Sequence, residues 1–178
     1  MNKNEIITHL NTSHSSFWDT AKQLPNPTTS VNGKWSVGQN VQHVNIGLSR
    51  LNKYLALPKS SIETNFGLSS RVSKSNETMN KVFRNAFENG VKSTDSFNPD
   101  ENLQTSIEEL INQGKDLLKV FNSNLENWSE DELETYNCPH PFLGKITVRE
   151  ILYFTIYHVQ HHHETIKKMK SDYLFDLK

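Results

Sequence analysis

The chain has few of the residues that interrupt or cross-link a polypeptide. Its 178 residues include seven glycines, six prolines and a single cysteine, Cys138. One cysteine excludes an internal disulfide and a CxxC-type zinc or redox site, and it suits a reducing compartment such as the cytoplasm. Scarce glycine and proline leave long uninterrupted segments, in which apolar residues recur every three or four positions. This pattern is typical of helical proteins.

An excess of one charge and long apolar runs are also lacking. Lys and Arg number 19 and Asp and Glu number 20, so the formal net charge is -1. Such a balanced chain has no global field that attracts nucleic acid or anionic lipid, and we expect neither as a partner. No apolar stretch has the length of a signal peptide or of a membrane span. We therefore expect a cytoplasmic protein that does not enter membranes and whose ligand or substrate is a small molecule.

Four long amphipathic segments determine the expected fold class. The length suits one domain over residues 1–178. Capping boxes open three of the segments, at Ser36, Ser106 and Thr147. We expect an all-α protein, a four-helix bundle, with helices from about 4 to 24, from Ser36 to just before Pro58, from about 105 to 125 and from about 147 to 170.

A long insert, residues 59–100, separates the second and third of these helices. It is too long for a bare loop. Part of it predicts a shorter helix with an apolar face formed by Met79, Val82, Phe83, Ala86 and Phe87. The stretch PKSSIETNFGLSSRVSKSN reads as irregular. An insert of this length lets the chain return to its starting end before the third helix begins, and another short helix is expected after Ser129.

Four of the eight histidines lie in the segment HVQHHHETI, which begins at His158. Residues four apart face the same way on a helix, so His158 and His162 can direct their imidazoles to one point. On a helical wheel His163 lies on the other edge of the apolar stripe and His161 points furthest toward solvent. Both a metal site and the polar edge of a surface helix explain this spacing.

A catalytic divalent ion usually needs a third protein ligand. His43 is the best candidate, because it lies in the middle of the second helix beside the apolar stripe. His9, His14 and His140 compete with it. His14 falls on the core stripe of the first helix, where a buried, hydrogen-bonded histidine is expected. His140 lies between two prolines, where turn chemistry or an exposed ring is expected.

Several familiar catalytic motifs are missing. A zincin protease needs HExxH, but Val159 stands where the glutamate would be. There is no GxSxG elbow, no GxxxxGK[ST] loop and no GxGxxG between a strand and a helix. A lone cysteine such as Cys138 is usually inert without a charged neighbour to activate it. No catalytic residue can therefore be named from the sequence.

Two blocks of sequence, WSVGQNVQHV and GKITVREILYFTIYHVQHHHETI, resemble the DinB/YfiT-like superfamily of metal-binding four-helix bundles. In that family a tryptophan and a Ser or Thr open the second helix, and a histidine follows eight residues after the tryptophan. A G-x-[LI]-T-x-x-E opening and an HxxxH pair mark the last helix. The matching residues here are Trp35, Ser36, His43, Gly144, Ile146, Thr147, Glu150, His158 and His162. The resemblance does not extend to the insert.

The resemblance implies a divalent ion, zinc or nickel, held by His43, His158 and His162. Relatives include thiol S-transferases that use bacillithiol or mycothiol, isomerases and presumed hydrolases, and fold alone does not choose among them. We expect a metal-dependent transferase of a low-molecular-weight thiol or a hydrolase. The alternatives are a non-catalytic stress-response protein that binds a metal or a small ligand, and a histidine cluster without metal. The family includes homodimers, so a second copy is a further expected partner.

Overall fold

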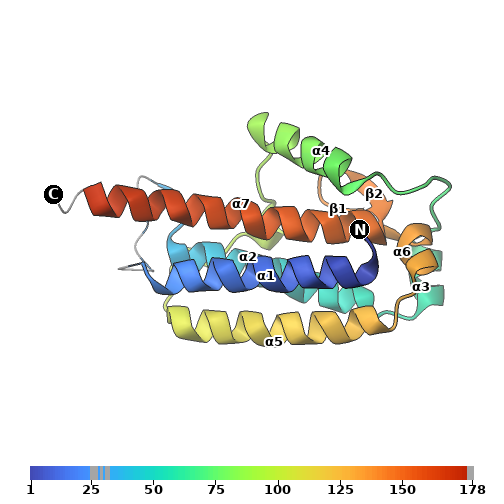
Figure 1. Ribbon diagram of the computed structural model, residues 1–178, viewed down its shortest axis with the longest axis horizontal. Helices are drawn as coiled ribbons and strands as arrows, with labels where there is room; N and C mark the ends of the chain where they lie inside the picture. The colour runs from blue at the N-terminus through green and yellow to red at the C-terminus, as the bar shows by residue number, and fades with distance from the viewer. Residues whose placement is uncertain (25–27, 29, 31–32, 176–178) are drawn as a thin grey trace.

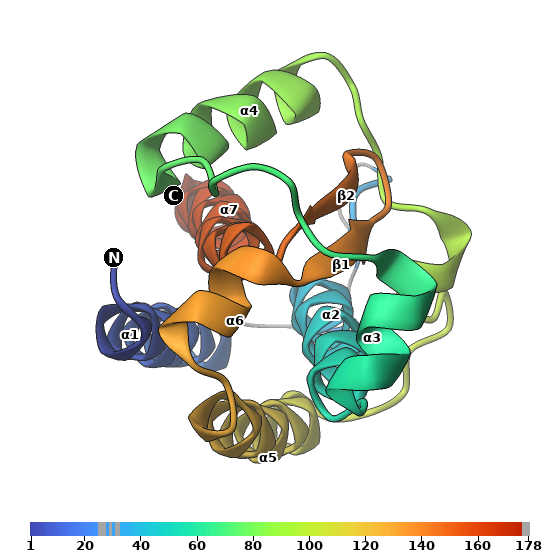
Figure 2. The same ribbon diagram turned by 90° about the vertical axis from the view of Figure 1, so that its right-hand side faces the viewer.

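Four long helices form the body of the protein in the computed structural model, which describes residues 1–24, 28, 30 and 33–175. They are α1 (Lys3–Lys22), α2 (Val37–Leu55), α5 (Ile107–Glu126) and α7 (Val148–Phe175). Seen along the bundle, they occupy its four corners in the cyclic order α1, α5, α2, α7 (Figure 2). The predicted all-α four-helix bundle is confirmed.

The helices do not follow a simple up-and-down order. Helices α1 and α7 run in one direction, and α2 and α5 run in the other (Figure 1). Because α2 and α5 are neighbours that run in parallel, a short turn cannot join them, and the chain must cross back along the bundle. The long insert makes this crossing, as predicted.

The helix starts follow from local sequence. Ser36 and Ser106 each accept a hydrogen bond from the backbone N–H three residues later, at 3.1 and 3.2 Å. At the start of α7, the backbone N–H of Thr147 donates to the Glu150 carboxylate at 3.0 Å, and the backbone N–H of Glu150 donates to the Thr147 hydroxyl at 3.2 Å. All three capping boxes are confirmed. The final helix extends to Phe175, beyond the predicted end. The sequence has prolines at 25 and 27, which predict the end of the first helix after residue 24, and both lie outside the described residues.

The insert contains two α-helices and one turn of 3-10 helix. These are α3 (Lys59–Phe66), α4 (Asn76–Glu88) and η1 (Asp95–Phe97). Helix α4 was predicted, and it lies along the outer side of α7 (Figures 1 and 2). The expectation of an irregular segment was wrong for Lys59–Phe66, which is helical, and it is confirmed for residues 67–75. Ile62 is the single buried residue of α3, so this helix has no apolar period that a sequence can show.

A small hairpin lies beside the start of α7 and follows the predicted short helix α6 (Glu130–Thr135). Strand β1 (Asn137–His140) pairs antiparallel with β2 (Gly144–Thr147), and His140 lies opposite Gly144. Gly144 has a φ of 71°, which favours glycine. Of the two alternatives for His140, an exposed ring is wrong, because the residue is only 4% exposed. Turn chemistry is found, since Nδ1 accepts from the backbone N–H groups of Phe142 and Leu143, both at 3.4 Å. The strand was not predicted because it contains Pro139, and proline is tolerated only in edge strands.

Close helix packing is clearest at Gly114 in the middle of α5. A Cβ there would lie 2.7 Å from Oδ1 of Asn45 and 2.9 Å from Cζ2 of Trp18. Only glycine lets α1 and α2 approach α5 this closely. The bundle core contains fully buried apolar side chains from all four helices, among them Ile6, Leu10, Phe17, Val41, Phe121, Leu152 and Ile166. Among the described helices, none has both the length and the apolar character of a membrane span.

Candidate metal centre

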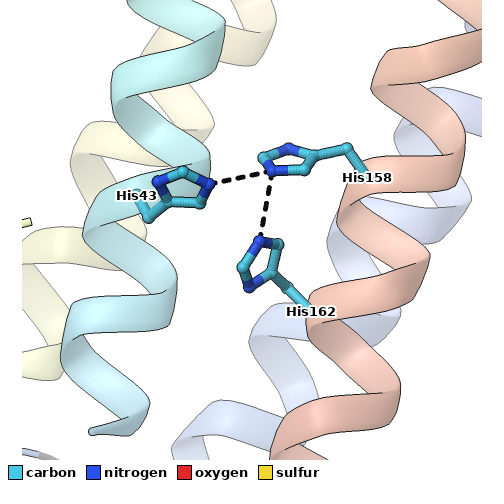
Figure 3. Close-up of side chains that lie close together, drawn as sticks. All are labelled: His43, His158 and His162. Atoms are coloured by element: carbon cyan, nitrogen blue, oxygen red, sulfur yellow. Dashed lines mark hydrogen bonds between the residues drawn. The ribbon is translucent and has the colours of Figure 1, made fainter. Parts of the chain in front are cut away.

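The three predicted ligand residues meet between α2 and α7. His43 lies in the first half of α2, and His158 and His162 lie one turn apart on α7. Their rings point toward one another across the space between the two helices (Figure 3). Nε2 of His158 is 2.9 Å from Nε2 of His43 and 3.1 Å from Nε2 of His162. The helical pair and the third histidine thus share one locus, and occupation of that locus by a metal remains a prediction.

Two of the rings are held by acceptors behind them. Nδ1 of His43 donates to the carbonyl oxygen of Phe97, and Nδ1 of His162 donates to Oδ1 of Asn40, both at 2.7 Å. The Asn40 amide is itself oriented by donation from Nδ2 to the carbonyl of Ser36 at 2.8 Å. Because Nδ1 carries the hydrogen in both rings, Nε2 of the neutral imidazole is bare and available as a ligand.

Burial keeps these rings neutral. It lowers the pKa of His43 and holds the pKa values of His158 and His162 well below the ordinary value, and the neighbouring histidines act in the same direction. Trp35 adds to the shielding, since its ring stacks on His162 with 6.2 Å between centroids. Neutral imidazole is the form that binds a metal, so little proton release is needed at neutral pH.

The donor set fits a divalent transition ion. Two imidazole nitrogens on one such ion, each bonded at about 2.0–2.1 Å, lie roughly 3 Å apart. The observed separations from His158 agree with this value. Imidazole ligands suit zinc and nickel, among other ions. Among the described residues, the cluster of potential ligands around this point consists of the three histidines, without Cys138 or His140. Three protein ligands are typical of catalytic sites, whereas structural zinc sites usually have four.

The remaining histidines of α7 lie outside the cluster. His161 is exposed, as predicted, but its ring also stacks on Phe87 of α4 with 4.8 Å between centroids. Nε2 of His163 contacts Oγ1 of Thr20 on α1 at 2.8 Å. His163 therefore faces the other edge of the helix, in agreement with the helical wheel.

A cavity of about 410 Å³ lies beside the three histidines. Residues from α1, α2, the insert, the hairpin and α7 line it, and its aromatic walls include Trp35, Phe87, Phe97, Phe142 and Phe154. Cavities of a few hundred Å³ with apolar walls and a few polar groups are typical of small-molecule sites. The cluster thus has space next to it for a substrate.

Two buried histidines, His14 and His140, also line the cavity with opposite hydrogen-bonding character. Nδ1 of His14 donates to the carbonyl of Leu10 at 2.8 Å, so its Nε2 is bare. Nδ1 of His140 accepts from the backbone N–H of Phe142 at 3.4 Å, so its Nε2 carries the hydrogen. Burial lowers the pKa of each ring to about 4. His14 is buried and hydrogen bonded, as predicted, whereas His9 is exposed.

Sequence reasoning missed the groups that orient the ligands. Asn40 offered a signal, since it is a polar residue on the buried side of α2, one turn before His43. The carbonyl of Phe97 offered no sequence signal, because it is a backbone group 54 residues from His43 and every residue type carries one. The aromatic walls from the insert and the hairpin depend on tertiary contacts in the same way.

Three histidines on the second and last long helices, beside an apolar cavity, make the protein a four-helix bundle with a candidate metal site. The chain belongs to the DinB superfamily, whose sequence profile matches residues 18–166. This match confirms the resemblance seen in the two sequence blocks. A search of curated proteins finds no match.

Two solved structures share the fold. The first is YfiT from Bacillus subtilis, described as a probable metal-dependent hydrolase with an unusual four-helix bundle topology. It is 15% identical with a TM-score of 0.63, covering 97% of this chain and 89% of that chain. The second is TT2238, a four-helix bundle protein, which is 12% identical with a TM-score of 0.55, covering 94% and 99%. At these identities the likeness shows the fold alone.

Proposed function

We propose that this protein is a metal-dependent hydrolase that holds one divalent ion, zinc or nickel, on His43, His158 and His162. The observation that carries the proposal is the convergence of three neutral imidazoles at the wall of a largely apolar cavity. The description of YfiT as a probable metal-dependent hydrolase supports the same reaction class. An ion bound there supplies Lewis acidity, which makes water a stronger acid and polarises carbonyl or phosphoryl groups.

Other residues would orient the ligands, exclude water and accept a proton. Asn40 and the carbonyl of Phe97 keep two ligand rings in the tautomer that leaves Nε2 bare. The aromatic walls exclude water around a substrate and so strengthen electrostatic interactions inside the cavity. No Asp or Glu lines the cavity within the part of the chain that the structure describes. The bare Nε2 of buried His14 and the exposed His161 are therefore the candidate proton acceptors in the lining.

Transfer of a low-molecular-weight thiol is the second candidate reaction. It uses the same cluster, because an ion on three imidazoles favours the thiolate form of a bound thiol. Cys138 does not supply that thiolate, since burial raises the pKa of its thiol to about 12. The thiol would have to enter the cavity as a cofactor. A metal-binding protein without turnover is the remaining alternative.

Metal content tests the cluster directly. Untagged wild-type protein and the variants His43→Ala, His158→Ala, His162→Ala and His161→Ala are loaded with zinc or nickel, dialysed and measured by mass spectrometry. We expect about one ion per chain in wild type and in His161→Ala, and loss of the ion from the other three. Equal loss from His161→Ala, or no ion in wild type after loading, would contradict the assignment.

Turnover separates the reactions. Wild-type protein with and without its ion is tested on panels of esters, amides and phosphoesters, with His158→Ala as the inactive control. Hydrolysis that needs the ion but no added thiol supports the hydrolase. Activity that appears only with an added thiol, accompanied by loss of free thiol, identifies a transferase. Stoichiometric ion binding without either activity supports the non-catalytic alternative.

A further inference from the structure

The cavity beside the histidines has an uneven distribution of charge. Besides its aromatic walls and its histidines, it is lined by two cationic residues, Arg50 and Lys92, while no acidic residue lines it in the described chain. Both cationic side chains are exposed. They therefore lie at the rim, where the cavity meets solvent. A cavity of this kind favours an apolar molecule with a negative charge near its outer end.

Helix α2 sets the distance between the two ends of such a molecule. Arg50 follows His43 by seven residues, which places both on the same face and about 10 Å apart along the axis. Gly47 lies between them, one turn from His43. A Cβ at Gly47 would meet no heavy atom within 4 Å among the described residues. Because Gly47 has no side chain, the part of the cavity between the histidine cluster and Arg50 stays unfilled.

The insert fixes the position of Arg50. Its guanidinium carbon lies 4.4 Å from the centre of the Phe97 ring, and Nη2 donates to the carbonyl of Ser96 at 2.5 Å. A guanidinium has five N–H groups, so the others are free to bind a planar anion such as a carboxylate. The same η1 turn therefore orients a ligand residue through the Phe97 carbonyl and a rim cation through the Phe97 ring.

We propose that the cavity binds a small apolar carboxylate, with its apolar body against the aromatic walls and its carboxylate at Arg50 and Lys92. If the proposed hydrolase function holds, the substrate is an ester or amide that carries this carboxylate about 10 Å from the bond to be cleaved. Only this second statement rests on the proposed function. Binding of the apolar carboxylate requires the cavity and its rim, and it does not require an ion.

Binding of three matched probes to chelator-treated protein tests the proposal. The probes are 6-phenylhexanoate, its uncharged amide and 6-phenylhexylamine, which share one body and differ in charge. Removing the ion prevents the carboxylate from ligating a metal. We expect the carboxylate to bind at least about tenfold more tightly than the amide, and the amine to bind most weakly. Equal affinity of carboxylate and amide would overturn the anion preference.

Variants then locate the binding site. Arg50→Gln and Lys92→Gln each weaken carboxylate binding, by up to about fivefold for an exposed charge, and leave amide binding unchanged. Lys53→Gln is the matched control, because Lys53 is an exposed cation on the same helix that does not line the cavity. Gly47→Leu fills the cavity and abolishes binding of carboxylate and amide while the ion content stays at the wild-type level. An unchanged affinity in Arg50→Gln or in Gly47→Leu would refute the site.

The two proposals can fail separately. Carboxylate binding in a protein that never retains an ion would leave the ligand class intact and remove the hydrolase. Stoichiometric ion binding and turnover without any preference for anionic substrates would support the hydrolase and refute the proposed ligand class. Circular dichroism and thermal unfolding of Gly47→Leu show whether lost binding reflects a filled cavity or a misfolded chain, and Arg50→Gln gives an independent answer at the surface.

Discussion

Glu150, the acidic member of the capping box at the start of α7, also forms a buried ion pair with Arg71, and its substitution should destabilise the fold. The Glu150 side chain is fully buried, with an exposed fraction of 0%. Its two oxygens accept a forked pair of bonds from Arg71 at 2.6 and 2.7 Å. They also accept from the backbone N–H of Lys74 at 2.8 Å and of Thr147 at 3.0 Å. The Glu150 carboxylate thus links the segment between α3 and α4 to the first turn of α7 through four hydrogen bonds.

The substitution Glu150→Gln preserves the volume and removes the charge. The amide NH2 replaces one of the two carboxylate oxygens and then faces the donors of that oxygen, which are one N–H of Arg71 and the backbone N–H of either Lys74 or Thr147, while the remaining oxygen still accepts. Breaking one side of a buried ion pair typically costs 3–5 kcal/mol. Because the Arg71 side chain is 42% exposed and returns to water, we expect the lower end, about 3 kcal/mol. For a chain of this size that corresponds to a fall in Tm of about 6–12 °C.

Glu109→Gln is the matched control, because Glu109 holds the same capping position in α5 but is exposed. Equilibrium unfolding in urea should show a change below about 0.5 kcal/mol for this variant. Ion content measured on folded protein should stay at the wild-type level in both, since neither residue touches the histidine cluster. A loss of equal size in the two variants would show that capping alone accounts for the effect, and would refute the buried ion pair as its cause.

Three further predictions follow from buried polar groups. Asn40→Ala removes the acceptor behind His162 and should weaken zinc binding by about 10- to 100-fold, measured by competition with a chelating dye; unchanged affinity would show that the orienting bond is dispensable. The pKa values of His14 and His140 are about 4 in the folded chain, so the unfolded chain binds protons first below pH 6.5. Stability in urea should therefore fall between pH 6.5 and 4, by on the order of 3 kcal/mol per histidine, and a flat profile would contradict this. Burial raises the pKa of the Cys138 thiol to about 12, so a thiol reagent at neutral pH should react at the rate of unfolding and not faster.

The bundle and its histidine cluster were predictable because their signals are local. Capping boxes at Ser36, Ser106 and Thr147 and the helical period require no knowledge of tertiary structure. The i,i+4 spacing of His158 and His162 fixes their common face in the same way. The choice of His43 as third ligand could not be made from spacing, since its position beside α7 depends on the order of the helices. The family resemblance made that choice.

The insert and the hairpin were less predictable because their structure depends on partners far away in sequence. Helix α3 buries only Ile62, and Leu68 just beyond it forms an isolated bridge with Tyr136. His140 becomes part of a strand only when Lys145 and Gly144 return beside it. The cavity is likewise assembled from segments of the insert, the hairpin and three long helices. Its ligand preference could therefore be argued only from the three-dimensional structure.

The hydrogen bond from His43 to the carbonyl of Phe97 would make the insert and an ion at the proposed site mutually dependent. Whatever holds η1 in place also holds a ligand ring in place, and thermodynamic linkage requires the influence to be equal in both directions. One hydrogen bond of about 1 kcal/mol limits this coupling to roughly fivefold. A molecule packed beneath Phe97 would then tighten the binding of an ion at the proposed site, and the ion would tighten the binding of that molecule by the same factor.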